Sequence, residues 1–446
     1  MKMKTKKINT LILASAMIFL GACKKDNPDP VVPDPVDPVT NLDCNGVDNG
    51  TSILDDCGVC QQAYIYNVVS HQVTLLDDTA GVVVSDPMDM VIMPNDPMNP
   101  YWNASCIVAP ENYDFTHVGA MGPASTVSYG GQTTRLMMAK QLTDALKNGT
   151  HDLSQLQQMW TTGTGFDNGI DNADKILRSK TSASPTASAT VKDQLDNMLV
   201  NYSDEVLANW SGDASNTSGG EYTTSSQGRT VHINAKGMEI DQCFAKALIG
   251  GLCFDQSVNK YLSVSVVGAD NTDRTDHYTE MEHKWDEGFG YVYGMVEDNT
   301  TGDLSTDALL GKYLNKSGFE TEKAAVWEAF KLGRAAIVGN DDNIRDEQTP
   351  IIKANLSKVI AAKAVGYLQS SADLLASEGG VSADYFHALS EGWGFILSLQ
   401  YTDWFTNSDV NAMLTQLEAD NGFWSRDATE LDAMADAILA VTGSLD

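Results

Sequence analysis

A motif that occurs twice constrains the fold of this chain more than any other feature. Its copies span residues 280–291 and 384–395, and both read acid-x-x-His-x-x-x-Glu-Gly-aromatic-Gly-aromatic. An α-helix turns about 100° per residue, so the acid, the histidine and the glutamate of each copy share one helix face. Two glycines inside a helix cost roughly 1 kcal/mol each relative to alanine. Their presence indicates the close approach of a neighbouring helix or of a ligand.

The repeat extends to the segment before each motif. An Ala-Lys-Ala-apolar sequence occurs at residues 245–248 and again at residues 362–365, ahead of the corresponding histidine. We therefore expect two similar helical hairpins, packed about a pseudo-twofold axis in a bundle.

The remainder of the C-terminal region also has the apolar periodicity and the capping residues of helices. The predicted fold class is mainly α, with an all-helical domain at residues 109–446 that contains the two repeated hairpins. Besides the two motifs, helices are expected at residues 133–148, 153–161, 191–210, 238–262, 322–338, 346–376, 410–419 and 429–441.

The N-terminus has the three parts of an export signal. Residues 2–7 are rich in lysine, residues 8–20 are apolar but too short to span a bilayer, and residues 20–23 read Leu-Gly-Ala-Cys. This sequence resembles the lipobox of bacterial lipoproteins, which implies a signal peptide at residues 1–22 and a lipid on Cys23. The resemblance predicts a protein of the outer membrane or cell surface that contacts the membrane through this lipid.

A linker and a cysteine-containing spacer are expected between the leader and the helical domain. Residues 23–42 are rich in proline and aspartate, which predicts an extended acidic linker. Residues 43–108 contain short alternating apolar segments, which predict a few strands. Four cysteines in or near this spacer can form disulfides in an oxidising compartment, and their pairing stays open. They are Cys44, Cys57, Cys60 and Cys106.

The acidic residues between Asp43 and Asp56 alternate with glycines and cysteines. They resemble the short Asp-Cys-x-Gly modules of bacterial surface proteins. Such carboxylates can hold calcium, although no complete EF-hand loop is present. The alternative is a disulfide-stapled spacer without a metal.

The overall charge limits the class of partner. The chain has 60 acidic and 29 basic residues, and its formal net charge is −31. Nucleic-acid binding needs a basic surface, so no nucleic-acid partner is expected. The same field attracts cations.

The repeated acids and histidines are the candidates for chemistry, because the sequence has no zincin, nucleophile-elbow or Walker motif. One hypothesis is that each histidine and glutamate form a structural pair. The other is a metal or ligand site built from both copies. Its candidate residues are Glu280, His283, Glu287, Asp384, His387 and Glu391.

The Glu-x-x-His spacing of the first copy also occurs in di-iron bundles, which need further glutamates from neighbouring helices. Helix-rise arithmetic places Glu239 about 20 Å from His283, the histidine of its own hairpin. A di-iron centre is therefore not expected.

Four segments, at residues 129–135, 239–248, 282–291 and 330–337, resemble a lipoprotein family called domain of unknown function 4856. The family is similar to imelysin-like proteins, which are helical envelope proteins associated with the acquisition of iron or other metals. Their hallmark is Gly-x-His-x-x-Glu, and here Met281 and Asp286 occupy the outer positions. The resemblance therefore implies a role in a metal site only for His283 and Asp286.

The sequence therefore predicts a lipid-anchored envelope protein that binds a metal ion or metal complex, such as one containing iron. An imelysin-like metallopeptidase and a structural or adhesive surface lipoprotein are the alternatives. No catalytic residue is assigned, and other envelope proteins are possible partners.

Overall fold

The computed structural model describes residues 42–445 except 56, 71, 97–98, 100–106, 120–121 and 275–276. The predicted leader, the lipidation site Cys23, the linker as far as residue 41 and Cys106 lie outside the described residues. The chain divides into two compact units, Met1–Ala104 and Ser105–Asp446. The predicted start of the helical domain, residue 109, lies close to this division.

The N-terminal unit contains the short strands that the alternating pattern predicts. β1 (Ile53–Leu54) pairs with β2 (Cys60–Gln61), and a three-stranded antiparallel sheet has the order β4-β3-β5. The members of this sheet are β3 (Ala63–Asn67), β4 (Val73–Leu76) and β5 (Asp89–Ile92). Tyr64 on the central strand lies opposite Leu75 and Ile92, and Tyr64 and Ile92 are buried.

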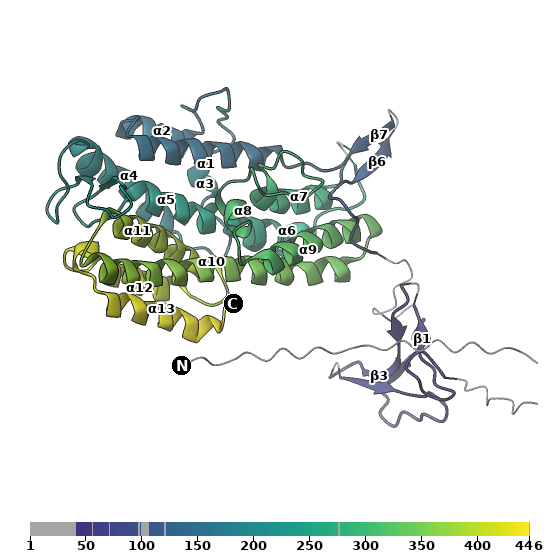
Figure 1. Ribbon diagram of the computed structural model, residues 1–446. Coiled ribbons are helices and arrows are strands. Elements are labelled where there is room, and N and C mark those ends of the chain that lie inside the picture. The colour runs from purple at the N-terminus through teal and green to yellow at the C-terminus, as the bar shows by residue number, and fades with distance from the viewer. Residues whose placement is uncertain are drawn as a thin grey trace, which may run out of the picture. The chain divides into compact units, whose positions relative to one another are not determined.

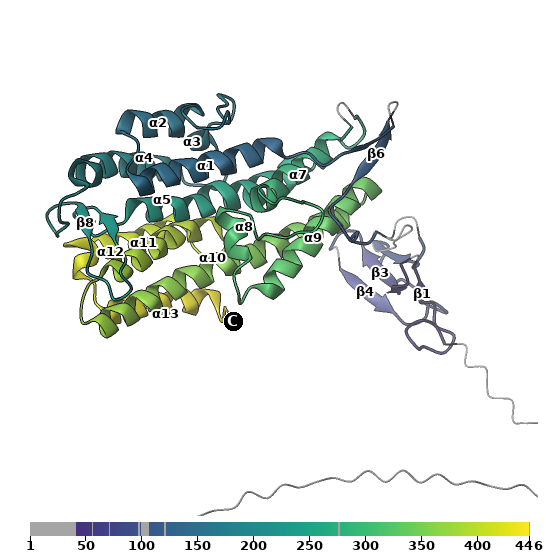
Figure 2. The same ribbon diagram turned by 45° about the horizontal axis from the view of Figure 1, so that its top comes forward.

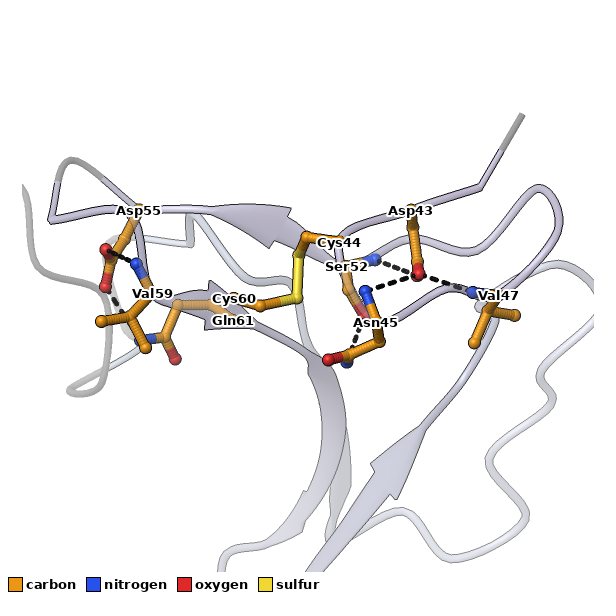
Figure 3. Close-up of a disulfide and its surroundings, with 9 residues drawn as sticks. All are labelled: Asp43, Cys44, Asn45, Val47, Ser52, Asp55, Val59, Cys60 and Gln61. Carbon is orange, nitrogen blue, oxygen red and sulfur yellow. Dashed lines mark hydrogen bonds between the residues drawn. A yellow bond between two sulfur atoms is a disulfide. The ribbon is translucent and has the colours of Figure 1, made fainter. Parts of the chain in front are cut away.

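A disulfide between Cys44 and Cys60 closes the first part of this unit, with the two Cα atoms 5.6 Å apart (Figure 3). The bond ties the loop at residues 43–50 to strand β2. Of the pairings that the sequence leaves open, the described residues thus contain the one between Cys44 and Cys60. Cys57 is half-buried in the following loop, and Cys106 is not described.

The acidic modules of the spacer form two similar loops. Asp43 accepts the backbone N–H groups of Asn45 and Val47, each at 2.9 Å. Asp55 accepts those of Cys57 and Val59 at the same distance. Figure 3 shows several of these contacts. The hydrogen bond from Val47 is the largest cause of a lowered pKa at Asp43. Each of these two aspartates therefore caps backbone N–H groups of its own loop.

The second unit is helical, with small hairpins at its margins. Its strands are β6 (Thr116–Gly119), β7 (Gly122–Ser125), β8 (Gly220–Tyr222) and β9 (Val231–Ile233), and β6 pairs with β7 and β8 with β9. Its α-helices are α1 (Gly130–Asn148), α2 (Leu153–Thr162), α3 (Leu177–Lys180), α4 (Thr190–Asn201), α5 (Ile240–Leu248), α6 (Val264–Val267), α7 (Glu280–Tyr293), α8 (Leu309–Leu314), α9 (Glu320–Gly339), α10 (Asp342–Glu378), α11 (Ala383–Ser398), α12 (Asn407–Glu418) and α13 (Ala428–Thr442). Its π-helices are η1 (Tyr202–Val206) and η3 (Ile249–Tyr261), and its 3₁₀ turns are η2 (Leu207–Asn209), η4 (Leu399–Tyr401) and η5 (Gly422–Ser425).

Every helical range expected from the sequence coincides with helical structure, and the mainly α fold class is confirmed. The sequence did not predict the short helices α3, α6 and α8. The range 238–262 is α-helical only at first and continues as the π-helix η3. There the carbonyl of Gly251 accepts a hydrogen bond from the backbone N–H of Ser182 at 2.7 Å, a contact from outside the helix that periodicity does not reveal. Among the described helices, none has both the length and the apolarity that a bilayer crossing needs.

The two hairpins of the repeat are present. The continuous helix formed by α5 and η3 leads to α7, and α7 packs on η3, while α10 leads to α11 and packs on it. Helix α5 lies between α1 and α11 (Figures 1 and 2). Each motif helix therefore contacts its own hairpin partner and one earlier helix, which is α1 for α7 and α5 for α11.

The glycines of each motif explain this double contact. A methyl group at Gly288 would lie 2.8 Å from Leu262, just after η3, and one at Gly290 would lie 2.6 Å from Tyr129, at the start of α1. In the second copy, a methyl group at Gly392 would meet Tyr367 of α10 at 3.2 Å. The paired glycines thus fit neighbouring helices, as the sequence allowed.

The second glycine of the second copy, Gly394, also faces an earlier helix. A methyl group at Gly394 would lie 2.4 Å from the Cβ of Lys246 on α5. Aromatic residues in and next to the two motifs lie in the core. These residues, Trp285, Tyr291, Tyr293 and Trp393, are all buried.

We predict that Gly394→Ala lowers the free energy of unfolding by about 1–3 kcal/mol, because the added methyl group overpacks the contact between α11 and α5. Gly366→Ala is the matched control, since Gly366 is exposed inside α10 and a Cβ there has open space. The control should raise stability by about 0.5–1 kcal/mol. Urea unfolding of both variants measures the difference, and equal stability of the two would contradict the proposed close contact.

Candidate functional site

The first copy of the motif forms a cluster whose polar groups are paired within the protein. The Nδ1–H of His283 donates to the carbonyl oxygen of Ser128 at 3.0 Å, and the ring stacks on Tyr278. Glu287 lies 3.9 Å from Nε2 of His283 and accepts from Gln132 at 3.0 Å. Helix α1 and the segment before it thus supply the partners of this histidine and glutamate.

The other acids of the first copy are also engaged. Glu280 is exposed and pairs with Lys284 at 3.0 Å. Lys284 in turn contacts Glu287 at 3.1 Å. The exposed end of the motif is therefore a ladder of ion pairs along one helix face.

Asp286 is fully buried at the centre of a hydrogen-bond network. Its Oδ1 accepts from the hydroxyl of Tyr113 at 2.7 Å and from Nε of Arg334 at 3.1 Å, and its Oδ2 accepts the N–H of Ser128 at 3.0 Å. Burial raises the pKa of this carboxyl, although Arg334 and the hydrogen bonds oppose the rise. Arg334 also lies 3.2 Å from the buried Glu282. Both oxygens of Asp286 therefore join helices α7 and α9 and the segment before α1.

We predict that Asp286→Asn lowers the free energy of unfolding by about 3–5 kcal/mol, because it removes one of the two buried carboxylates that pair with Arg334. Asp403→Asn is the matched control, since Asp403 pairs with Lys353 and its side chain is 78% exposed. The control should change stability by less than about 1 kcal/mol. Chemical unfolding of both variants tests this, and a small loss in Asp286→Asn would show that the buried pair is dispensable.

The second copy joins two helices that the sequence did not connect. The Nδ1–H of His387 donates to Glu239 at 2.7 Å, because an ionised carboxylate only accepts. Glu391 lies 3.8 Å from Nε2 of His387, pairs with Nζ of Lys246 at 2.7 Å and accepts from Tyr313 at 3.2 Å. The partners of the second histidine and glutamate therefore come from α5 and α8.

Asp384, the acid of the second copy, points to other partners. It pairs with Nε of Arg229 at 2.9 Å and accepts from the hydroxyl of Ser225. The structure thus places the predicted site residues in two clusters, one on α7 and one on α11, and no described residue forms a hydrogen bond or ion pair with both clusters. Among the residues that the structure describes, no group of three or more His, Cys, Asp or Glu side chains is arranged to hold a metal ion.

A cavity of about 560 Å³ adjoins only the second cluster. Helices α1, α5, α8 and α11 surround it, together with the segment that precedes α8. Its lining includes five cationic side chains and four carboxyl groups, besides His387. They are Lys140, Lys147, Arg229, Lys246, Lys312, Asp144, Asp241, Asp307 and Glu391.

The carboxyl groups of the cavity differ in charge. Burial raises the pKa of Asp241 to about 7, and the neighbouring Glu239 adds to the rise. Burial also raises the pKa of Asp307 to about 7, although two backbone N–H groups oppose it. At Glu391, burial favours the neutral form, but Lys246 and His387 outweigh it and lower the pKa. Near neutral pH, Glu391 is ionised, whereas Asp241 and Asp307 are only partly ionised.

The cations of the cavity differ in their partners. Lys140 pairs with Asp144 at 2.6 Å, and Lys246 and Arg229 have the partners given above. Within the described part of the chain, Lys147 and Lys312 have no hydrogen-bond or ion-pair partner. Burial lowers the pKa of Lys312, and the positive charges of Lys246, Lys316 and Lys147 lower it further. The cavity therefore gathers ammonium groups that the fold itself does not neutralise.

The fold and the site define a helical domain with a charged cavity between its helices. The chain belongs to the family described as "Domain of unknown function (DUF4856)", whose profile matches residues 110–443. No curated protein and no solved structure matches the chain.

Sequence reasoning identified His387 and Glu391 but missed most of their surroundings. Helix-rise arithmetic relates Glu239 only to the histidine of its own hairpin, whereas Glu239 contacts the histidine of the other hairpin. The Ala-Lys-Ala repeat was a usable signal for Lys246. Nothing in the sequence marked Tyr313 or Asp307, because α8 and the segment before it have no repeat or motif.

Proposed function

We propose that this protein is a lipid-anchored binding protein of the bacterial cell envelope, and that its ligand occupies the cavity beside α11. The observation that carries the proposal is a large cavity lined by charged side chains, among them Lys147 and Lys312 without partners in the fold. A concave site with a few convergent polar groups is the usual form of a ligand site. The lipid anchor rests on the lipobox-like sequence at residues 20–23.

The two alternatives explain less of the structure. A structural role fits the first cluster, where His283, Asp286 and Glu287 all contact protein groups. It does not account for the cavity beside the second cluster. A metallopeptidase needs about three protein ligands around its metal, and the described residues contain no group so arranged.

The geometry at His387 makes a metal complex one candidate for the ligand. Its bond to Glu239 places a proton on Nδ1, so Nε2, which lies 3.8 Å from Glu391, is the ring nitrogen left to bind a metal. An imidazole oriented by a carboxylate is a common metal ligand. Since the remaining donors would have to come from the ligand, a metal complex fits this site better than a bare ion.

We predict that some members of a solute panel raise the melting temperature of the wild-type protein but not that of Ala245→Trp. Ala245 lines the cavity on α5, so an indole there would fill the space. Ala362→Trp, on α10 and outside the cavity lining, is the matched control and should respond as wild type. The panel comprises organic acids, phosphates, amino acids, sugars and divalent metals with and without citrate, and the readout is differential scanning fluorimetry. If no solute shows this difference, the proposed binding function is wrong.

We also predict for the metal candidate that His387→Ala weakens the binding of ferric citrate by roughly tenfold or more, because a metal ligand is lost. His283→Ala is the matched control, since the ring of His283 lies in the first cluster, away from the cavity lining. Elemental analysis and calorimetric titration measure the effect. Equal binding by both variants would exclude His387 as a metal ligand.

A further inference from the structure

The cavity lining contains more basic than acidic side chains, whereas the whole chain contains more acidic than basic residues. The chain has about two acidic residues for each basic one, whereas cations outnumber carboxyl groups in the cavity lining. Asp241 and Asp307 are also partly protonated near neutral pH, because burial raises the pKa of each to about 7. A cationic ligand would therefore gain little from this lining, although it would be attracted to the surface elsewhere.

Three ammonium groups from three helices define the positive part of the cavity. Lys246 of α5 is held by Glu391 at 2.7 Å and by the side-chain oxygen of Gln242 at 2.5 Å. Lys147 lies in the last turn of α1, and Lys312 lies on α8. Lys147 and Lys312 are exposed and have no partner among the described residues. The charges of Lys246 and Lys147 are close enough to Lys312 to lower its pKa.

On the basis of the proposed binding function, we propose that the ligand is a small anion whose carboxylate or phosphate group lies between Lys147 and Lys312. The anion would neutralise two ammonium groups that have no other partner, through charge-assisted hydrogen bonds. Lys246 would add to the positive field while Glu391 keeps it in place. A metal would enter this site as part of an anionic complex.

The test is isothermal titration calorimetry of the full chain with sodium citrate, inorganic phosphate, glucose and putrescine. Citrate and phosphate separate the carboxylate from the phosphate form of the ligand. We expect at least one of the two anions to bind, and glucose and putrescine not to bind. The double substitution Lys147→Met and Lys312→Met should weaken anion binding by at least roughly tenfold, the factor expected for losing a hydrogen bond to a charged group.

Lys316→Met is the matched control, because Lys316 is exposed just after α8 and outside the cavity lining, and its anion affinity should equal that of wild type. Thermal unfolding of all variants checks that the exposed substitutions leave the fold intact. One outcome is that neither anion binds, but glucose or putrescine binds and Ala245→Trp abolishes that binding. In that case the anion inference is wrong and the binding function stands. If none of the probes binds, or if the double variant binds anions as wild type does, the anion inference is also wrong. Only a lack of any cavity-dependent ligand in the wider panel overturns the binding function itself.

Discussion

The close approach of helices at the paired glycines is the contact on which the rest of the structure depends. In each copy of the motif, the first glycine faces the hairpin partner and the second faces an earlier helix. A side chain at Gly394 would push α11 away from α5, and Lys246 could then no longer pair with Glu391. The same contacts that pack the bundle therefore position the charged residues of the cavity.

The two copies of the motif have the same framework but different environments. The third residue after the histidine is Asp286 in the first copy, where it forms a buried pair with Arg334. The corresponding residue in the second copy is Ser390, whose hydroxyl accepts the N–H of Glu239 at 2.8 Å. The first copy is thus closed by an internal ion pair, whereas the second places its histidine and glutamate at the wall of a cavity. This difference explains why the first copy of the motif forms a structural cluster, whereas the second copy forms part of a candidate binding site.

The sequence was sufficient to predict the helices and the hairpins, because apolar periodicity, capping residues and the repeat are local signals. It was not sufficient to predict which helices meet. Glu239 and His387 are far apart in the chain, and only the packing of α5 against α11 brings them together. The π-helical continuation after Leu248 and the cavity-lining Asp307 likewise depend on tertiary contacts that leave no periodic pattern. The resemblance to imelysin-like proteins pointed to Asp286 as a ligand, but the side chain is enclosed by Tyr113, Ser128 and Arg334.

The proposed binding function requires a ligand in the cavity between α1, α5, α8 and α11. The most direct measurement is a crystal structure of the wild-type protein with the solute that binds it most tightly in solution. We predict electron density for that solute in the cavity, with an anionic group within hydrogen-bond distance of Lys147 and Lys312. Density for the solute at another part of the surface, with the cavity filled only by solvent, would contradict it.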